Sequence, residues 1–575
     1  MNNIEIAAVM EEMADLLELH GENAFRVRAY RTGAKAISAL EESVADIVRA
    51  GERDLTELDG IGSTLAEKCN TLVSTGKLPQ LEKLREETPL VLIQMTRIPG
   101  LGVKKALVLH RELGVMSLED LKAACEEGKV RALKGFAAKT EKSILDGLEI
   151  AQAASQRIRL DQAEKLVERL RLQLQSDVIE RIEFAGSFRR GKETVGDIDI
   201  LVVSQHHTAV MDLLEAFPGR VSTIVRGDTK MSIRVDEQFQ VDLRVVPAAS
   251  FGAALQYFTG SKEHNVAVRS RARKLGMTVN EYGVAKLDSP EEYIAGETEE
   301  SVYEVLGLQW VSPELREGRQ ELSWSSGEGK LPDLVELQHV VSDLHMHTTA
   351  TDGSASIAEM AAAAKERGLS FIAITDHSKR VSMAMGLDEA RLLAQWEEVD
   401  RYNAEQTNGV RVLKGIECDI LEAGGMDLSD EVLAQADWVI GSVHYGQKQP
   451  RDQITKRILG ALENPHVDII AHPTGRLLGS RPPYEVDLHA VIEAAAEHGK
   501  ALELNASPRR LDLSEENLML AIRSGIPIAI NTDAHSPDGL DVMRFGIKQA
   551  RRAGIKKDQV INTWSLEKLV KWLQR

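Results

Sequence analysis

Paired cysteines, membrane-length apolar runs and a surplus of basic charge are all missing from this 575-residue chain. Its three cysteines, Cys69, Cys125 and Cys418, are scattered with no pair at ligand spacing, which suits a reducing compartment. No apolar run approaches the roughly 20 residues that span a bilayer. The first residues have neither a basic segment nor an apolar core, so no secretory signal is expected. We therefore expect a cytoplasmic protein that does not associate with membranes.

The net charge of −19 at pH 7 at first argues against a nucleic-acid partner. Binding to phosphates, however, needs a local positive potential rather than a basic average. Basic clusters occur at residues 26–31, 104–105 and 269–274. Charge alone therefore neither supports nor excludes DNA. The length is more informative, because 575 residues exceed one ordinary core and predict three to five domains.

A turn rich in glycine and arginine precedes two aspartates near the middle of the chain. Residues 186–191 read Gly-Ser-Phe-Arg-Arg-Gly, and residues 196–199 read Gly-Asp-Ile-Asp, followed by an apolar run. In a strand, Asp197 and Asp199 point to the same face, where two carboxylates repel each other unless a divalent cation lies between them. Asp242, in another apolar strand, can supply a third carboxylate.

The turn before these aspartates suits phosphate. Backbone N–H groups, the Ser187 hydroxyl and the guanidinium groups of Arg189 and Arg190 are all donors that phosphate oxygens accept. Three carboxylates, a metal and a phosphate cradle predict two-metal phosphoryl transfer. A solvated acidic strand edge is the alternative, but it explains neither the Gly-Ser turn nor the arginines.

Two Gly-x-Gly turns interrupt the helical pattern of the N-terminal quarter. Gly60 and Gly62 form one turn, Gly100 and Gly102 form the other, and each turn precedes an amphipathic helix. Glycine permits a tight turn and lets a phosphate approach the helix N-terminus. The turns are similar to the helix-hairpin-helix element, which grips the DNA backbone without reading sequence. Residues 133–136 offer an imperfect third copy.

Helical and strand periodicity both fail between residues 315 and 337, which predicts a linker. Beyond it, seven apolar strand-like runs alternate with helical stretches, a pattern typical of a parallel barrel whose strand C-termini open on one face. Polar residues follow these runs: His345, His347, Asp376, His377, Glu417, His444, His472, Asn505, Asp533 and His535. Imidazoles and carboxylates that converge there suit Zn²⁺, Mn²⁺ or Fe²⁺. A hydrogen-bonded scaffold histidine is the alternative at any single position.

The first half of the chain, from Ala24 to about Leu308, resembles the family X DNA polymerases, the group that contains polymerase beta. Besides the motifs at 186–191 and 196–199, it has Asp-Leu-Arg at 242–244 and Tyr-Phe-Thr-Gly-Ser at 257–261, in the family's order. The resemblance implies that two Mg²⁺ or Mn²⁺ ions are held by Asp197, Asp199 and Asp242. The residues implied to bind dNTP or DNA are Gly186, Ser187, Arg190, Arg244, Tyr257, Phe258, Gly260, Asn265 and Arg269.

Three of these implied roles are specific. Ser187 and Arg190 match contacts to the triphosphate, and the segment of Tyr257 and Phe258 matches the one that packs against the incoming sugar. Simple core packing is the alternative for these two rings. Lys68 lies where the family's lyase nucleophile lies and would attack a sugar aldehyde as a Schiff base. Thr64 stands where a basic residue is usual, so a weak lyase activity or a merely solvated lysine is expected.

The last 240 residues are similar to the polymerase-and-histidinol-phosphatase (PHP) domain, from Asp343 to about Ala550. Matching segments are His-x-His at 345–347, Thr-Asp-His at 375–377 and Thr-Asp-Ala-His at 532–535. The resemblance implies a trinuclear metal cluster with nine ligands: His345, His347, Asp352, His377, Glu417, His444, His472, Asp533 and His535. At Asp352 an ordinary turn aspartate is equally expected.

We therefore expect a multidomain fold with all-α helix-hairpin-helix domains, an α+β nucleotidyltransferase palm and thumb, and a distorted (βα)7 barrel. The expected domains are a lyase-like helical domain at 1–85, fingers with the second hairpin at 86–150, a palm at 151–260, a thumb at 261–315, a linker at 316–338 and a PHP domain at 339–575.

These features predict a polymerase that fills short gaps during DNA repair, joined to a metal-dependent 3′–5′ exonuclease or 3′-end phosphoesterase. The expected partners are gapped or nicked duplex DNA and dNTPs, bound by a monomer. The expected cofactors are Mg²⁺ or Mn²⁺ in the palm and two to three Mn²⁺, Zn²⁺ or Fe²⁺ ions in the PHP domain.

Two alternatives stay open. The barrel motifs alone permit a small-metabolite phosphoesterase, related to histidinol phosphatases, with a DNA-tethering N-terminal half. A non-enzymatic scaffold that holds DNA ends through the hairpins is the other.

Overall fold

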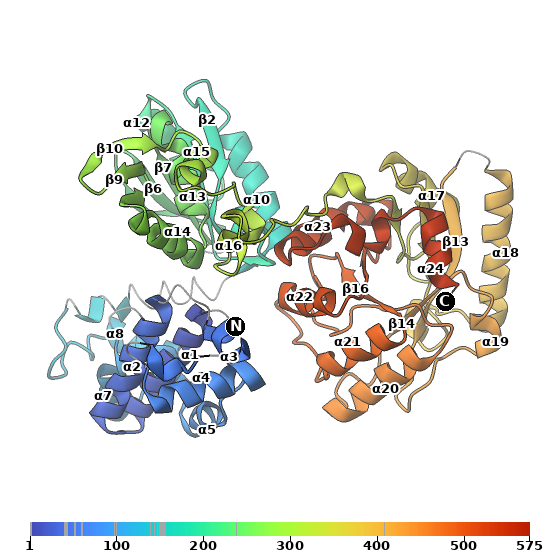
Figure 1. The fold of residues 1–575 in the computed structure, drawn as a ribbon, viewed down its shortest axis with the longest axis horizontal. Helices are drawn as coiled ribbons and strands as arrows, with labels where there is room; N and C mark the ends of the chain where they lie inside the picture. Colours follow the sequence, from blue (N-terminus) through green and yellow to red (C-terminus); the bar gives the residue numbers. More distant parts are fainter. Residues whose placement is uncertain are drawn as a thin grey trace.

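The fold is that of a computed structural model. It describes residues 3–39, 44–50, 53–58, 61–96, 98, 101–138, 140–142, 144–145, 148, 157–236, 239–406 and 409–574. Figure 1 shows helices alone in the N-terminal part, a mixed region in the middle and a ring of helices around strands in the C-terminal part. Among the described residues, no helix combines the length and the apolar character that a bilayer crossing requires.

The N-terminal helical unit packs around one core. Close contact between two of its helices depends on Gly33, because a Cβ there would lie 2.0 Å from Cδ2 of Leu65. Its elements are α1 (Asn3–Leu19), α2 (Ala24–Ala39), α3 (Val44–Ala50), η1 (Leu55–Glu57), α4 (Ser63–Thr75), α5 (Pro79–Glu87), α6 (Leu90–Thr96), α7 (Val103–Leu113) and α8 (Leu118–Glu126).

The palm, residues 157–245, is built on a five-stranded sheet in the order β2-β4-β7-β6-β5, with the short pair β1 and β3 beside it. Within the sheet β4 and β7 run parallel, and the other neighbouring strands are antiparallel. The elements are β1 (Ile158–Arg159), α10 (Leu160–Gln173), β2 (Arg181–Phe184), α11 (Gly186–Arg189), β3 (Thr194–Val195), β4 (Asp197–Val203), α12 (His207–Glu215), β5 (Arg220–Arg226), β6 (Lys230–Val235) and β7 (Phe239–Val245).

Alternation along the palm strands decides which side chains enter the core. In β7 the apolar residues are buried and the polar residues between them are only partly buried, so the strand has one apolar and one polar face. The apolar face packs with the apolar sides of α10 and α12 in one hydrophobic cluster. The polar face is consequently free to carry the acidic residues.

The thumb and the segment after it form the next unit, with the antiparallel sheet β10-β9-β8. The expected linker at 316–338 includes α16, and Arg316, Glu321 and Ser325 within it are buried, so this part of it is packed structure. The elements are η2 (Ala248–Ser250), α13 (Phe251–Thr259), α14 (Lys262–Lys274), β8 (Met277–Asn280), β9 (Gly283–Lys286), β10 (Ser289–Ala295), α15 (Glu299–Val305), η3 (Pro313–Leu315) and α16 (Glu321–Ser325).

Seven parallel strands, ordered as in the sequence, form the barrel of residues 337–574. A parallel bridge between Met346 and Ala534 joins the segments that follow the first and last strands, so the barrel nearly closes at its C-terminal end. The strands are β11 (Ser342–Asp343), β12 (Phe371–Ile374), β13 (Arg411–Asp419), β14 (Trp438–Ser442), β15 (Ile469–Ile470), β16 (Ala501–Asn505) and β17 (Ile528–Asn531).

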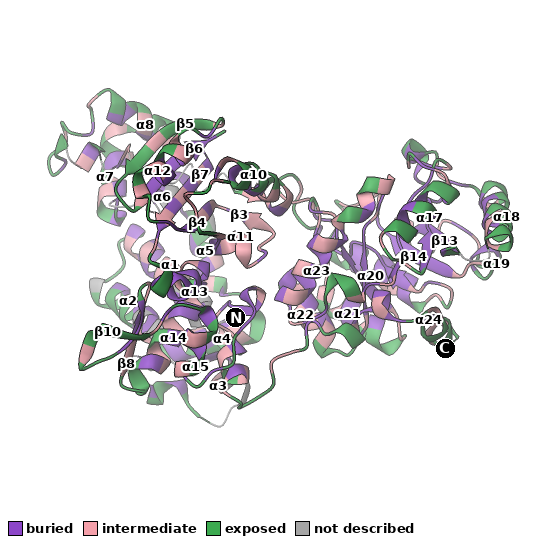
Figure 2. Cartoon of the chain, turned by 90° about the horizontal axis from the view of Figure 1, so that it is seen from above, coloured by how far each residue is buried: buried purple, intermediate pink, exposed green. Residues whose placement is uncertain are grey.

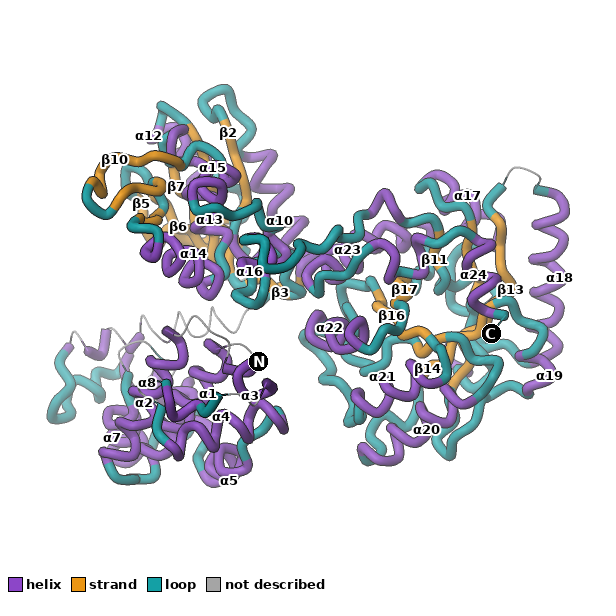
Figure 3. The backbone as a smooth tube through the Cα atoms, viewed as in Figure 1, coloured by secondary structure: helices purple, strands orange, loops and turns teal. Residues whose placement is uncertain are grey.

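Helices surround these strands, as Figure 3 shows, and Figure 2 shows the strands buried beneath them. The predicted fold class is thereby confirmed. The helices are η4 (Leu337–His339), α17 (Ile357–Glu366), η5 (Ser382–Ala384), α18 (Glu389–Glu405), α19 (Asp430–Leu433), α20 (Arg451–Glu463), α21 (Leu488–Glu497), α22 (Glu515–Arg523), η6 (Pro537–Val542), α23 (Met543–Arg552), η7 (Lys557–Gln559), η8 (Ile561–Thr563) and α24 (Leu566–Leu573).

The barrel docks on the palm through α23 and the loop after β16. Leu511 and Phe545 are buried in the same hydrophobic cluster as the palm core. Around them, Arg544 pairs with Glu164 at 2.8 Å, and Arg476 pairs with Glu193 at 2.7 Å. Apolar burial enclosed by ion pairs is the usual anatomy of a specific interface.

Two candidate active sites

The three palm aspartates share the polar face of the sheet. Asp197 and Asp199 are two residues apart on β4, and the parallel register places Asp199 directly opposite Asp242 on β7. Asp242 is held from both sides, since it accepts hydrogen bonds from the Ser232 hydroxyl and, at 2.8 Å, from the Gln240 amide. The predicted juxtaposition of three carboxylates is therefore present.

Nearby arginines compensate the charge of this cluster only in part. Burial, followed by the charges of Asp197 and Asp242, raises the pKa of Asp199 to about 7. Burial and Asp242 also raise the pKa of Asp197. Oxygen ligands crowded in this way fit a hard divalent cation such as Mg²⁺ or Mn²⁺, which relieves their repulsion.

The glycine-rich turn lies against this cluster. Gly186 has a left-handed φ of +63°, and a Cβ on it would lie 2.5 Å from Oδ2 of Asp199, so only glycine fits this close approach. Ser187 follows it in α11 and is half-buried. Arg190 ends the turn; its Nη1 donates to the carbonyl of Thr259, and its Nε donates to Glu317 at 3.1 Å.

The remaining predicted contacts surround the end of α13. Tyr257 and Phe258 stack edge to face with ring centroids 5.1 Å apart, and the Arg244 guanidinium lies 4.6 Å from the centroid of Phe258. Asn265 donates to the Tyr257 carbonyl at 2.7 Å, so its amide braces the segment that carries both rings. Gly260 also approaches Arg190, since a Cβ there would be 3.2 Å from Nη1. Arg269 bonds to the Asn265 carbonyl at 3.2 Å, one helical turn away.

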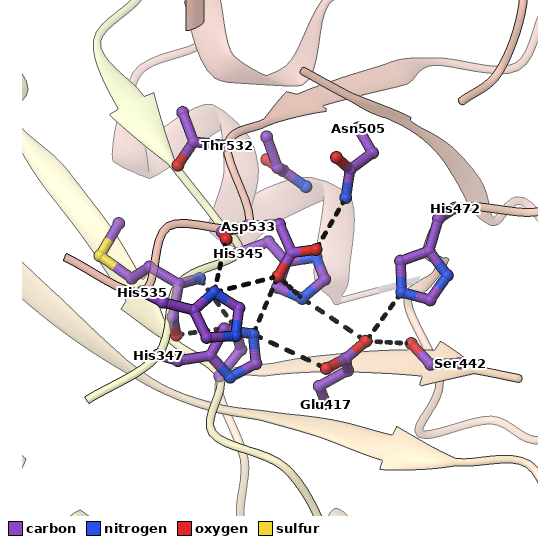
Figure 4. A network of polar contacts seen from close by, with 12 residues as sticks. His345, His347, Glu417, Ser442, His472, Asn505, Thr532, Asp533 and His535 are labelled. Carbon is purple, nitrogen blue, oxygen red and sulfur yellow. Dashed lines mark hydrogen bonds and ion pairs between the residues drawn. The ribbon is translucent and has the colours of Figure 1, made fainter. Parts of the chain in front are cut away.

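The nine predicted barrel ligands converge at the C-terminal ends of the strands. Figure 4 shows His345, His347, Glu417, His472, Asp533 and His535 among them. Asp533 Oδ1 lies 3.1 Å from His347 Nε2 and 3.5 Å from His345 Nε2. Glu417 Oε1 lies 3.1 Å from His472 Nε2 and 3.4 Å from His444 Nε2.

Asp352, the turn residue, also belongs to this cluster. Its two oxygens lie 3.4 Å from His535 Nε2 and 3.5 Å from His377 Nε2. The nearby imidazoles hold its pKa well below the usual range, although burial acts in the opposite direction. Its position between two histidines sets it apart from an ordinary turn aspartate.

Two buried ring nitrogens at the centre of this cluster lack hydrogen bonds among the described residues, Nε2 of His345 and Nδ1 of His347. Nδ1 of His377 and Oε2 of Glu417 instead lie 2.7 Å apart as an ion pair. An unpartnered buried polar atom costs ~1–3 kcal/mol, so such a concentration needs an explanation. Three overlapping groups here can each hold an ion, one around Asp352, one around Asp533 and one around Glu417. Imidazole and carboxylate donors suit Zn²⁺, Mn²⁺ or Fe²⁺.

The pKa values of neighbouring histidines in this cluster are shifted in opposite directions. Burial opposes protonation of His377, but Glu417 and Asp352 raise its pKa to about 10. Burial and the neighbouring His377 lower the pKa of His347 to about 4. The backbone adds strain, because His472 and Asp533 have positive φ values of 29° and 55°. Strained, oppositely perturbed groups in one place are typical of a functional site.

The two hairpin turns of the N-terminal unit repeat the same backbone hydrogen bonds. Ile61 N–H donates to the Leu58 carbonyl at 3.1 Å, and Leu101 N–H donates to Ile98 at 3.0 Å. Gly62 and Gly102 then cap α4 and α7 in extended conformations, and a Cβ at either would meet no atom within 4 Å. Both helix N-termini are therefore open to an approaching phosphate. The predicted contacts Gly60 and Gly100 lie outside the described residues.

The possible third copy at residues 133–136 has a matching turn. Phe136 N–H donates to the Leu133 carbonyl at 3.1 Å, and Ala137 occupies the place that glycine takes in the other two.

Lys68, on α4, is partly buried, and its Nζ lies 3.9 Å from Oε1 of Glu67.

Comparison with known proteins shows that both sites occur together in one type of enzyme. The DNA polymerase beta palm family matches residues 157–235, and the DNA polymerase beta thumb family matches residues 254–317. The PHP domain family matches residues 343–507. Helix-hairpin-helix families match residues 1–78 and 92–149.

One relative covers the whole molecule. The DNA polymerase/3′-5′ exonuclease PolX of Bacillus subtilis (strain 168) is 40% identical over 578 residues, spanning 100% of both chains. The chain belongs to the family X DNA polymerases with a C-terminal PHP domain. The predicted resemblance is thereby confirmed.

Other relatives of this family X polymerase match its barrel only. A probable phosphatase of Thermoanaerobacter sp. (strain X514) is 37% identical over 237 residues, which is 39% of this chain and 91% of the relative. A probable phosphatase of Acetivibrio thermocellus is 33% identical over 246 residues, 41% of this chain and 95% of the relative. The barrel is therefore a module that also occurs without a polymerase.

Three polar residues of the barrel site were not predicted from the sequence. Glu503 accepts from His345 Nδ1 at 2.8 Å, and Asp419 accepts from His444 Nδ1 at 3.1 Å, so each carboxylate orients a ligand histidine. Arg510 places its Nε 3.7 Å from Oδ2 of Asp533, at the edge of the cluster. A carboxylate inside an apolar strand run, as in Ala-Leu-Glu-Leu at 501–504, was the available signal for Glu503.

Proposed function

We propose that this chain is a DNA polymerase that fills short gaps by two-metal nucleotidyl transfer and trims 3′ ends in its PHP barrel. The observation that carries the polymerase half is the register of Asp199 with Asp242 beside the left-handed turn at Gly186. The observation that carries the nuclease half is the nine-residue cluster with its unpartnered buried atoms.

In the palm, Asp197, Asp199 and Asp242 would hold Mg²⁺ or Mn²⁺. Ions bound there would lower the pKa of the primer 3′-hydroxyl and neutralise charge on the triphosphate. The N–H groups and hydroxyl at Ser187 and the guanidinium of Arg190 would bind the phosphates beside the aspartates.

Other palm and thumb residues orient the substrate. Tyr257 and Phe258 lie where the sugar of the incoming nucleotide packs, and Arg244 fixes the ring of Phe258 from behind. Asn265 and Arg269, one turn apart on α14, reach the minor groove of the nascent pair. The turns at Gly62 and Gly102 bind the DNA backbone on either side of the gap.

In the barrel, the nine ligands would hold two to three ions. Such ions supply an activated water and stabilise charge on the phosphate as its ester bond breaks. Arg510, beside Asp533, binds a phosphate oxygen of the 3′-terminal nucleotide. We infer that the chain works as a monomer on gapped or nicked duplex DNA in the cytoplasm.

The two active sites are tested with two variants on one gapped, labelled duplex. The double variant Asp197→Ala, Asp199→Ala loses dNTP incorporation and keeps 3′ digestion. The variant His345→Ala does the reverse. Equal loss of both activities in either variant would contradict separate sites.

Lys68 is proposed as a Schiff-base nucleophile on a 5′-deoxyribose phosphate. Borohydride trapping on an incised abasic duplex yields a covalent adduct with the wild type and none with Lys68→Ala. Trapping that persists in Lys68→Ala assigns the adduct to another amine.

The relatives that match only the barrel favour a second candidate, hydrolysis of a small phosphate monoester. Release of inorganic phosphate from such a substrate, compared with nucleotide release from a DNA 3′ end at equal enzyme concentration, separates the two.

A further inference from the structure

An ion cluster joins the polymerase turn to the barrel. Arg190, the last residue before Gly191, donates from Nε to Glu317 at 3.1 Å. Glu317 also accepts from Arg552, at the end of α23 in the barrel, at 2.9 Å. The same Arg552 donates to the Arg190 carbonyl at 2.7 Å. A barrel side chain thus contacts both the backbone of Arg190 and the carboxylate that binds its side chain.

This cluster is almost fully withdrawn from solvent. The side chains of Arg552, Glu317 and Arg190 are 1%, 9% and 12% exposed. Lys192 also lies 3.4 Å from Oε2 of Glu317. At such depth the Nε of Arg190 has few alternative partners, so removing Glu317 leaves that nitrogen without its carboxylate. Glu515 on α22 binds the second branch of Arg552 and fixes that guanidinium in turn. The position of Arg190 is consequently determined by residues from both units.

The contacts leave one branch of Arg190 for a ligand. Its Nε is occupied by Glu317 and its Nη1 by the Thr259 carbonyl. Nη2 has no hydrogen-bond partner among the residues that the structure describes. The turn that carries Arg190 lies against the aspartates, because the Arg190 N–H donates to the Gly186 carbonyl at 3.3 Å and a Cβ on Gly186 would lie 2.5 Å from Oδ2 of Asp199. A planar guanidinium held at two corners presents its third nitrogen in a fixed direction beside the aspartates.

We propose that Glu317 is a positioning residue for the incoming nucleotide and that the barrel, through Arg552, holds it in place. The PHP barrel is then a structural part of the triphosphate site and not only a second enzyme attached to the first. This inference rests on the proposed polymerase function, in which Arg190 binds the triphosphate.

The test measures single-nucleotide gap filling by the full-length chain as a function of dNTP concentration. Glu317→Gln and Arg552→Met each raise KM for dNTP by about tenfold, with kcat changed by much less, because only the orientation of a binding group is lost. Arg552→Lys, which keeps a charge, recovers part of the loss. In an Arg190→Ala background, Glu317→Gln adds no further effect, since the group that it positions is gone.

A matched control lies on the same boundary. Arg551 on α23 pairs with Glu314 at 2.7 Å, with both side chains less than one-fifth exposed, but neither contacts Arg190. Glu314→Gln removes an ion pair from the same boundary, as Glu317→Gln does, and leaves KM for dNTP unchanged. Digestion of a 3′ end by the barrel reports that each variant is folded.

Three results would overturn the inference while leaving the polymerase function intact. They are an unchanged KM in Glu317→Gln and Arg552→Met, an equal rise in Glu314→Gln, and a fall in KM, which would mean that Glu317 competes with the triphosphate. Absence of incorporation by the wild type itself would instead refute the proposed function.

Discussion

At the scale of single residues, Glu503 is a carboxylate that supports the barrel cluster without being one of its nine predicted ligands. It accepts four hydrogen bonds: from His345 Nδ1 at 2.8 Å, from the Asn531 amide at 3.0 Å, from the His472 backbone at 2.8 Å and from the Asn505 amide at 3.3 Å. It is completely buried. Because Nδ1 of His345 is engaged in this way, Nε2 is directed at Glu417 and Asp533.

Glu503→Gln is expected to weaken metal retention roughly 10–100-fold, because an amide cannot accept all four hydrogen bonds and no longer fixes the ring of His345. Metal content after dialysis against a graded chelator series measures this directly. Glu497→Gln, on the exposed side of α21, is the matched control and retains the wild-type content. Equal metal content in the wild type and Glu503→Gln would contradict the orienting role.

At the scale of elements, the N-terminal unit contains the same glycine-capped turn before two of its helices. The turns before α4 and α7 share their hydrogen bonds, their extended glycine caps and their open helix N-termini. Such repetition suits a ligand with a repeating backbone, since each turn can bind one phosphate without reading a base.

The double variant Gly62→Ala, Gly102→Ala is expected to bind gapped duplex about tenfold more weakly, and its affinity depends less on salt because fewer phosphates are contacted. Fluorescence anisotropy at several salt concentrations measures both effects. Each lost glycine cap is expected to lower the free energy of unfolding by about 1 kcal/mol. Gly460→Ala, at an open position on α20, is the control and leaves DNA affinity unchanged. A steeper salt dependence in the double variant would refute phosphate contact at these turns.

Contact between α11, α15 and the segment after the thumb depends on Glu299. This buried carboxylate pairs with Arg189 at 2.7 Å and with the fully buried Arg316 at 2.5 Å. Burial acts to raise its pKa, but Arg316 and Arg189 outweigh that effect and lower the pKa to about 2. The folded pKa thus lies below the ordinary value of 4.5, so the stabilisation is complete above pH 4.5 and is lost as the pH falls toward 2.

Glu299→Gln is expected to lower the free energy of unfolding by about 3–5 kcal/mol at pH 7, because it leaves Arg316 buried without its partner. The deficit relative to the wild type shrinks as the pH falls from 4.5 toward 2, because the Glu299 carboxylate is protonated near pH 4.5 in the unfolded wild type but only near pH 2 in the folded one. Denaturant unfolding at a series of pH values measures it, with the exposed Glu300→Gln as control. A deficit that is independent of pH would show that packing, and not charge, is responsible.

At the scale of the whole molecule, the palm and the barrel share a hydrophobic cluster at their contact. Phe545 and Leu511 lie in the barrel part of the sequence but pack in the palm core, where they are 2% and 0% exposed. The ion pairs from Arg544 and Arg476 surround this apolar contact. The two active sites are consequently carried on a common scaffold.

Phe545→Ala is expected to destabilise the chain by about 3–5 kcal/mol, because it leaves a cavity in a shared core. Hydrogen exchange followed by mass spectrometry should record faster exchange in β4 of the palm as well as in the barrel. Phe25→Ala, at a site 79% exposed, is the control and changes neither. Exchange that accelerates in the barrel alone would mean that the palm core is independent of it.

Local pattern was sufficient to predict the parallel barrel, the side on which Asp197 and Asp199 lie, and the strand ends that carry the histidines, whereas the palm and thumb followed from the resemblance to family X polymerases. Periods of 2 and 3.6 residues fix the direction of each side chain relative to its own backbone, and the chemistry of those side chains then implies metal and phosphate. The two hairpins were visible for the same reason, since a Gly-x-Gly turn is a local signal.

Contacts between distant segments were decided only in three dimensions. The pairing of Asp199 with Asp242, the four hydrogen bonds at Glu503 and the link from Arg190 to Arg552 all depend on strand register and domain docking. The segment at 316–338 has the composition of a linker, yet part of it is buried because barrel and thumb residues close over it. Sequence determined which groups this protein carries, whereas packing of its apolar faces determined which of them meet, because burial fixes register and orientation over separations that no local period encodes.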